Sequence, residues 1–327
     1  MGVATESFAY VVEHGQARAI PPDEANGLSR GEDSLLWLHL HGPDEQAAAW
    51  TSLKGDVPVS VLAALAAAET RPRCEAIGDG ALVNLRGVGA AGLQSADPLT
   101  SIRLWMTRGR VVSATRARVD ALGVACDAVT AGRVTDPGEL LAVLASAISH
   151  QLDAVIVDVG DRLDDLEETL AEDEAADLRR DTNAIRAQAI AFRRFVAPDR
   201  IALDNAADLP CGWLDDQDRT DIREAANRFA RMTEELDAIR DRSSLVSEQL
   251  AEGRAEVLER RSFFLSVVAL IFLPLTFFTG LLGINVKGIW YADHPQAFNG
   301  VLIICASIAV ALSVFFSIKR WIGKQQD

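Results

Sequence analysis

Two long apolar stretches near the C-terminal end of the sequence constrain the fold more than any other feature. Residues 263–282 are twenty consecutive positions without a charged side chain, and residues 298–318 form a second stretch of similar length. Twenty residues of helix extend about 30 Å, which is the thickness of the hydrocarbon core of a bilayer. The sequence therefore predicts two transmembrane helices, at 262–282 and 298–318, surrounded by membrane lipid.

Basic side chains predict the orientation of this pair. Lys and Arg close to a transmembrane helix are retained on the cytoplasmic side. The loop at 283–297 contains only Lys287, whereas basic side chains flank the pair on its outer sides: Arg254, Arg260, Arg261, Lys319, Arg320 and Lys324. We therefore expect a multi-pass protein with both termini in the cytoplasm, an external loop at 283–297 and a cytoplasmic tail at 319–327.

The rest of the chain is strongly acidic. The 327 residues carry a formal net charge of -15, from 47 acidic and 32 basic side chains, and the apolar stretches contribute almost nothing to it. An acidic surface repels the phosphates of nucleic acid, which excludes nucleic acid as a partner. The first residues contain no apolar run of signal-peptide length, so we expect this region to stay in the cytoplasm.

Short apolar runs broken by Gly, Pro and Asp predict β-strands in the first third of the chain. The expected strands are residues 8–12, 35–40, 80–85, 102–107 and 111–115. Apolar residues at helical spacing intervene at 43–53 and 59–68. Residues 1–136 are therefore predicted to form a cytoplasmic α/β domain.

Helical periodicity dominates from residue 137 onward. We expect two long antiparallel helices within residues 137–214, the first at 138–172 and the second at 174–195. Pro198 and Pro210 are expected to interrupt the chain that follows. A proline inside a helix removes a backbone donor and clashes with the preceding turn.

A seven-residue apolar repeat runs from Ile222 to Val257 in the predicted stalk helix at 215–261. Such a repeat predicts a helix that packs against the cytoplasmic domain or against neighbouring subunits. No turn signal separates the stalk from the first apolar stretch, so one continuous helix of about 100 Å is expected. The overall fold class is an α+β membrane protein.

The sequence contains no phosphate-binding GK[ST] loop, GxSxG elbow, HExxH or zinc-finger spacing. It therefore predicts neither an enzyme nor a permanently bound cofactor. His39 and His41 lie two positions apart on a predicted strand, and so on one face, where they offer two ligands for a metal ion. A polar strand face without metal is the alternative.

The segment from Phe272 to Asn285, FLPLTFFTGLLGIN, resembles the end of the first transmembrane helix in the CorA family of divalent metal ion transporters. In that family a Gly-Met-Asn motif or a variant closes the pore helix, and Gly283-Ile284-Asn285 occupies this place here. Leu281-Leu282 before the motif, with Gly288-Ile289 and Ala292-Asp293 after it, is similar to the zinc-transporting ZntB branch. The order of acidic domain, long helices, stalk and two spans also resembles the family.

The resemblance implies a homopentamer in the bacterial inner membrane, with five copies of the first span around a central pore and the second span outside. The family's pore positions correspond here, from the outer mouth inward, to Asn285, Ile284, Gly283, Gly280, Thr276, Leu273, Leu265 and Ser262. The amide of Asn285 is expected to hold a hydrated divalent cation through the water molecules of the ion. This metal ion is cargo rather than a resident cofactor.

Lys287 departs from the branch, in which the corresponding position is commonly small. Five such lysines near an outer mouth would repel a divalent cation by about 0.5 kcal/mol at physiological salt. Asp293 would offset this charge, and the imidazole of His294 suits Zn²⁺ better than Mg²⁺. The predicted cargo is Zn²⁺, and the alternatives are a Mg²⁺ channel of the same family or a non-transporting membrane scaffold or sensor.

Overall fold

The computed structural model describes residues 6–26, 34–42, 53, 57–67, 71–89, 99–169, 175–283 and 295–323. The chain divides into two compact units, Met1–Ser247 and Glu248–Asp327. Each unit is described by itself below.

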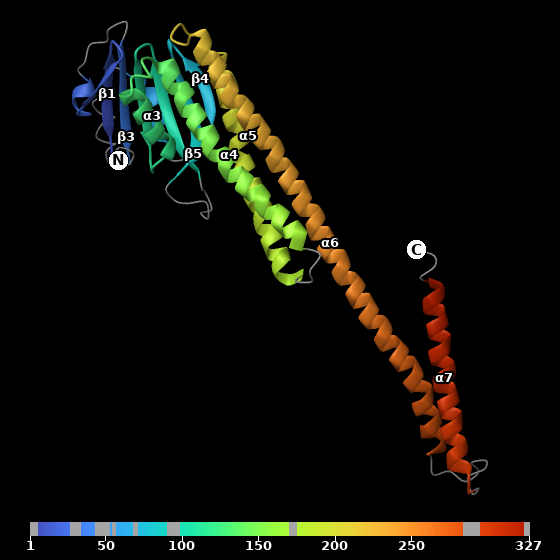
Figure 1. The fold of residues 1–327 in the computed structure, drawn as a ribbon. Helices are drawn as coiled ribbons and strands as arrows, with labels where there is room; N and C mark the ends of the chain where they lie inside the picture. The colour runs from blue at the N-terminus through green and yellow to red at the C-terminus, as the bar shows by residue number, and fades with distance from the viewer. Residues whose placement is uncertain are drawn as a thin grey trace. The chain divides into compact units, whose positions relative to one another are not determined.

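A seven-stranded mixed sheet forms the first part of unit one (Figure 1). Its strands lie in the order β2-β1-β3-β7-β6-β5-β4, and only β3 and β7 pair in parallel. The turns between β1 and β2 and between β6 and β7 use Gly15 and Gly109 at positive φ, a conformation that glycine adopts without steric cost. The strand bounds are β1 Phe8–Glu13, β2 Gln16–Ile20, β3 Ser34–His41, β4 Arg73–Ile77, β5 Gly80–Val88, β6 Leu99–Thr107 and β7 Arg110–Thr115.

Helices cover both faces of this sheet because successive side chains of each strand point to opposite sides. In β3, Leu35 and Trp37 enter the larger core beneath α3, α4, α5 and α6, whereas Leu36 and Leu38 enter a smaller core with α2. The helix bounds are η2 Glu24–Asn26, α2 Val59–Ala66, α3 Asp120–Thr130, α4 Pro137–Thr169, α5 Ala175–Ala207, α6 Asp216–Leu282 and α7 Ala297–Gly323.

The N-terminal part of α6 is held in unit one by apolar packing. Ile222, Phe229 and Leu236, which occupy one position of the predicted seven-residue repeat, are almost fully buried in the larger core. Full burial of each side chain of this size contributes about 1.5–3 kcal/mol. The repeat is therefore covered within the chain itself as far as Val246, whereas Val257 is exposed.

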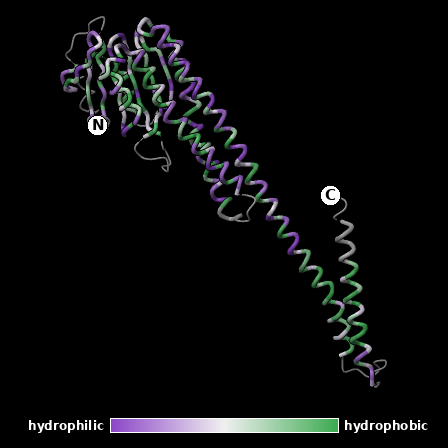
Figure 2. The backbone as a smooth tube through the Cα atoms, viewed as in Figure 1, coloured by the Kyte–Doolittle hydropathy of each residue, from purple (hydrophilic) through white to green (hydrophobic). Residues whose placement is uncertain are grey.

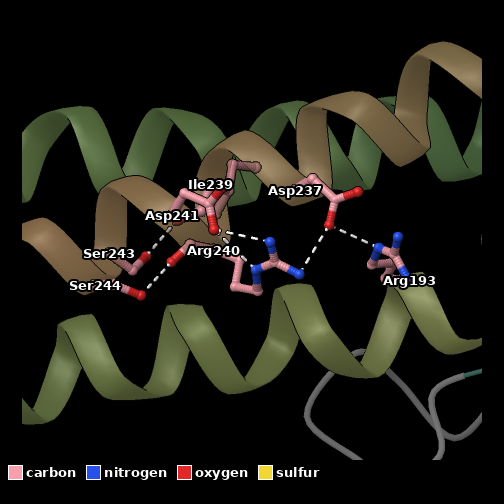
Figure 3. A network of polar contacts seen from close by, with 7 residues as sticks. All are labelled: Arg193, Asp237, Ile239, Arg240, Asp241, Ser243 and Ser244. Carbon is pink, nitrogen blue, oxygen red and sulfur yellow. Dashed lines mark hydrogen bonds and ion pairs between the residues drawn. The ribbon is translucent and has the colours of Figure 1, made fainter.

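Ion pairs fix how α6 lies against its neighbours (Figure 3). Oδ1 of Asp237 on α6 lies 2.7 Å from Nε of Arg193 on α5 and 3.1 Å from Nη1 of Arg240. Further along α6, Arg242 donates to the carboxylates of Asp164 and Glu167 on α4. Partly exposed pairs of this kind contribute about 0–1 kcal/mol each, so they orient the helices more than they stabilise them.

The expectation that Pro198 interrupts the second long helix is wrong, because α5 continues through Pro198 to Ala207. The helix survives because the turns after the proline bury Ala202, Leu203 and Ala206 completely in the larger core. This burial offsets the lost backbone hydrogen bond at residue 198. The strands β2 and β4 and the helix α3 were not predicted, and the expected helix at 43–53 lies almost wholly outside the described residues.

Candidate functional site

The C-terminal part of α6 and most of α7 are strongly apolar and lack a protein core of their own (Figure 2). Three helices are long and apolar enough to cross a membrane: Pro137–Thr169, Asp216–Leu282 and Phe298–Phe315. Half of the apolar window of Pro137–Thr169 is buried inside unit one, whereas none of the apolar windows of the other two is buried. The apolar side chains of α4 are therefore accounted for by packing inside unit one. The apolar windows of the other two helices have no such packing.

The predicted pore residues within α6, together with Gly283 directly after its last residue, share one face of the helix. At 100° per residue, the positions of Ser262, Leu265, Leu273, Thr276, Gly280 and Gly283 fall within an arc of about 80°. All six are exposed in the single chain, with Leu265 and Leu273 at 67% and 75%. We call this set the α6 stripe. Because α6 is continuous to Leu282, no break in the helix rotates one part of the stripe away from another.

The opposite face of α6 is partly covered. Its half-buried residues centre about 150° from the α6 stripe, and they are Val267, Val268, Ile271, Leu275, Phe278 and Leu282. The half-buried residues of α7 also form one face, Val301, Cys305, Ile308, Ala309 and Leu312. Since α7 runs beside the end of α6 within unit two (Figure 1), we infer that these two faces cover each other. The α6 stripe is left without a neighbour in the described part of the chain.

The α6 stripe combines apolar side chains with a few oxygen atoms. The hydroxyl of Thr276 donates to the carbonyl of Phe272 at 2.8 Å, which leaves lone pairs of the Thr276 oxygen available on the stripe. Pro274 lies inside the helix and removes the donor that would satisfy the Leu270 carbonyl. A β-carbon on Gly280 would have no atom within 4 Å, so the stripe is open there. Such a surface suits a narrow aqueous path with apolar constrictions.

The α6 stripe ends where the helix ends. The N–H of Gly283 donates to the carbonyls of Thr279 and Gly280, at 3.0 and 3.2 Å, and closes the last turn. The predicted outer-mouth residues that follow lie outside the described residues, namely Ile284, Asn285, Lys287, Asp293 and His294. Their roles remain predictions from the sequence.

His39 and His41 share one face of β3, as predicted, but the structure gives them partners in the core. His39 is fully buried, stacks on Phe8 at 4.8 Å between ring centroids, and lies within hydrogen-bonding distance of Ser113 and Thr115. Burial, and to a smaller extent the charge of His41, lowers the pKa of His39 to about 3. Among the described residues, no three His, Cys, Asp or Glu side chains come together to hold a metal ion.

Four carboxyl groups, which were not predicted from the sequence as a cluster, meet where the N-terminal ends of α4 and α6 touch. The N–H of Glu139 donates to Oδ1 of Asp136 at 2.9 Å, and the N–H of Asp218 donates to Oδ1 of Asp215 at 2.7 Å. The pKa of Asp218 is raised to about 7, mainly by burial and also by the charges of Asp136, Asp215 and Glu139, while a hydrogen bond from the Asp215 N–H opposes the shift. The sequence patterns Asp-x-x-Glu at 136–139 and Asp-x-x-Asp at 215–218 are typical of helix N-termini and could have indicated these carboxyl groups.

Known proteins share this architecture over its full length. The full-length CmaX protein superposes with a TM-score of 0.81 at 27% identity, covering 98% of this chain and 100% of CmaX. The CorA magnesium transporter from Methanocaldococcus jannaschii superposes with a TM-score of 0.80 at 15% identity, covering 96% and 98% of the two chains. At that identity the second likeness establishes the fold alone. An N-terminal α/β domain joined to a long helix with an apolar end thus defines the structural class that this chain shares with both proteins.

Sequence comparison identifies the family within that class. Residues 32–320 match the family described as CorA-like Mg²⁺ transporter protein. The Zinc transport protein ZntB of Pectobacterium atrosepticum is 30% identical over 327 residues, which cover 97% of this chain and all of the relative. The chain belongs to the CorA family, which confirms the resemblance noted in the sequence, and its members are ion transporters rather than enzymes.

Proposed function

We propose that this protein transports divalent metal cations, principally Zn²⁺, across the bacterial inner membrane as a homopentamer. Five copies of the apolar part of α6 surround the pore, α7 forms the outer ring, and both termini face the cytoplasm. These two helices are the transmembrane helices, with the loop between them outside.

The observation that carries the proposal is the uncovered α6 stripe. The face of α6 opposite to it is half-buried beside α7, whereas the stripe from Ser262 to Gly283 is exposed and holds the positions that the family resemblance assigns to the pore. Turning this face toward a common axis gives each apolar side chain a neighbour and leaves Thr276 and Gly280 beside the ion path. The lipid-facing alternative would place the glycines and hydroxyls of the stripe against acyl chains.

The chemistry of the path favours an ion that keeps its water. A ring of Asn285 amides offers neutral oxygens, which bind the hydration shell of a cation and do not demand that the ion dehydrate. The leucines at 265 and 273 then act as constrictions that close by excluding water. No charged side chain lies on the α6 stripe to trap the ion.

Zn²⁺ is preferred as cargo because the curated relative named above is a zinc transport protein and because His294 follows the proposed outer mouth. Imidazole binds Zn²⁺ much better than Mg²⁺. The second candidate cargo is Mg²⁺, which the family description favours and which amide oxygens accept equally well.

Metal flux into proteoliposomes tests the proposal. Purified protein is reconstituted, and the initial uptake of Zn²⁺ and of Mg²⁺ is measured with a trapped fluorescent indicator, with and without a pH gradient. Uptake of Zn²⁺ well above that of protein-free vesicles and faster than Mg²⁺ uptake is expected. Faster Mg²⁺ uptake would reassign the cargo, and no flux of either ion would favour a membrane scaffold.

A further inference from the structure

A buried arginine to which no described residue offers an anionic partner lies on the α2 side of the sheet, far in sequence from the α6 stripe. Arg103 on β6 is 1% exposed, and its Nη1 donates to the carbonyl of Leu65 at the end of α2, at 2.7 Å. Its Nε has no hydrogen-bond partner, and no carboxylate among the described residues accepts from it. Burying a guanidinium in this way is unfavourable by several kcal/mol unless an anion compensates it.

A second buried group beside it also lacks partners. Asn84 on β5 is directly opposite Arg103 in the register of the two strands, and it is 1% exposed. Both its amide nitrogen and its amide oxygen are without a hydrogen bond. The β-carbons of side chains directly opposite each other on antiparallel strands lie about 5 Å apart, so the unpaired amide of Asn84 and the partly paired guanidinium of Arg103 face the same small space.

Further donors surround this pair. Nη2 of Arg116 donates to the carbonyl of Ala66 at 3.1 Å, one residue beyond the carbonyl that holds Arg103. On the other side, Nε of Arg86 donates to the hydroxyl of Ser101 at 3.1 Å, two positions before Arg103 on the same strand face. The pKa of Arg103 is lowered to about 10, mainly by burial and also by the charges of Arg116 and Arg86.

Capping of α2 explains only part of this arrangement. The two carbonyls at the end of α2 carry partial negative charge and attract Arg103 and Arg116, as basic side chains at a helix C-terminus do. About half an elementary charge at the end of a helix leaves most of the combined charge of these two guanidinium groups uncompensated. It also does not provide a partner for Asn84, whose amide makes no hydrogen bond to either carbonyl.

We propose that the α2 end of the cytoplasmic sheet binds a phosphate-type oxyanion between Arg103, Arg116 and Asn84, with Ser101 and Arg86 at its edge. A tetrahedral oxyanion accepts several donors at once and pairs well with the planar fork of arginine. Arg116 is exposed and Arg86 is half-buried, so the site is approached from their side. The site is independent of the proposed cargo and of the pore.

Thermal unfolding of the full-length protein in maltoside detergent tests the proposal. Inorganic phosphate is titrated against sodium chloride at equal ionic strength, and glycerol 3-phosphate is tested in parallel to distinguish free from esterified phosphate. A Kd near 0.1 mM would raise Tm by about 5 °C at 10 mM phosphate. Equal shifts with phosphate and chloride in the parent protein would overturn the proposal.

Three variants assign the effect to these residues. Arg116→Gln is expected to weaken phosphate binding about tenfold, whereas Arg180→Gln, at an exposed arginine of α5, should leave it unchanged. Arg103→Met should abolish the response and raise Tm in phosphate-free buffer, because it removes an uncompensated buried charge. An unchanged response in Arg116→Gln and Arg103→Met would contradict the assignment.

A final variant tests whether the chain fills the site itself. Glu69 follows Ala66 by three positions and lies outside the described residues. A phosphate response of the same size in the parent and in Glu69→Gln supports an external anion. A response that occurs only in Glu69→Gln would show that an internal carboxylate occupies the site, and would overturn the proposal.

Discussion

The carboxylate of Asp218 occupies the space that a side chain at residue 138 would fill. A β-carbon on Gly138 would come within 2.0 Å of Oδ2 of Asp218, so only glycine lets the first turn of α6 press this closely on the first turn of α4. Asp218 is 3% exposed at this contact, and three other carboxyl groups surround it. The junction of the two helices therefore depends on the protonation of one buried acid.

We predict that Asp218→Asn raises the stability of the cytoplasmic unit at high pH and not at low pH. The pKa of Asp218 is raised from 3.8 to about 7, so the folded protein binds a proton more tightly than the unfolded chain. Stability is then lost as pH rises from about 4 to 7. We count half of this pKa shift, because the neighbouring carboxyls titrate together with Asp218. The expected loss in the free energy of unfolding is then about 2 kcal/mol.

Differential scanning fluorimetry at pH 5 and pH 8 checks this prediction. A Tm gain of about 5 °C at pH 8, with a much smaller gain at pH 5, is expected for Asp218→Asn. Asp216→Asn removes an exposed charge from the same helical turn and should not change the pH dependence. Parallel pH profiles for Asp218→Asn and the parent would contradict the assigned pKa.

The two faces of α6 should differ in access to water. In a background without the four native cysteines, Leu273→Cys on the α6 stripe should react with a charged thiol reagent and lose most of its metal flux. Leu275→Cys, on the half-buried face, should react slowly and keep its flux. The measurement is metal uptake into proteoliposomes after treatment with the reagent. Greater inhibition of Leu275→Cys than of Leu273→Cys would indicate that the α6 stripe faces lipid.

Removing the charge of Lys287 should accelerate uptake at low metal concentration. Lys287→Gly relieves a repulsion of about 0.5 kcal/mol at physiological salt, which corresponds to about a twofold higher initial rate. The gain should shrink as salt rises, and Lys287→Arg should show none because it keeps the charge. Equal rates for Lys287→Gly and the parent at low salt would show that this residue does not face the ion path.

A pentamer is expected when the protein is extracted in a mild detergent. The covered part of the seven-residue repeat, as far as Val246, is used within each chain, so assembly depends on the apolar part of α6 and not on a stalk coiled coil. Native mass spectrometry should report five chains, and the Leu236→Ala variant should lower stability without changing this number. A dimeric mass would contradict the proposed pore.

The apolar part of α6 could be predicted from the sequence because helical periodicity operates over consecutive residues, whereas the positions of the α6 stripe follow from the family resemblance and their role in a pore stays a prediction. The sequence could not predict which part of the seven-residue repeat is covered by the same chain, since that depends on how α4, α5 and α6 pack in space. Pro198 was misjudged for the same reason: local propensity favours a helix end, and the burial of Leu203 and Ala206 outweighs it.

Polar groups that only the tertiary structure brings together could not be predicted from the sequence either. The register of β5 and β6 determines that Asn84 lies opposite Arg103, and the packing of α6 on α4 determines that Asp218 contacts Gly138. Neither contact follows from the neighbouring residues in the sequence. The two histidines were correctly assigned to one strand face. Their burial against Phe8 and Ser113 became visible only in the folded sheet.

Zn²⁺ flux through Asn285→Ala tests the central claim most directly. Loss of the amide ring should reduce uptake in proteoliposomes by at least tenfold while the detergent-extracted protein keeps its oligomeric mass. Asn299→Ala makes the same substitution at an exposed position near the start of α7 and should retain the parent rate. Zn²⁺ uptake by Asn285→Ala equal to that of the parent would contradict the assignment of the pore.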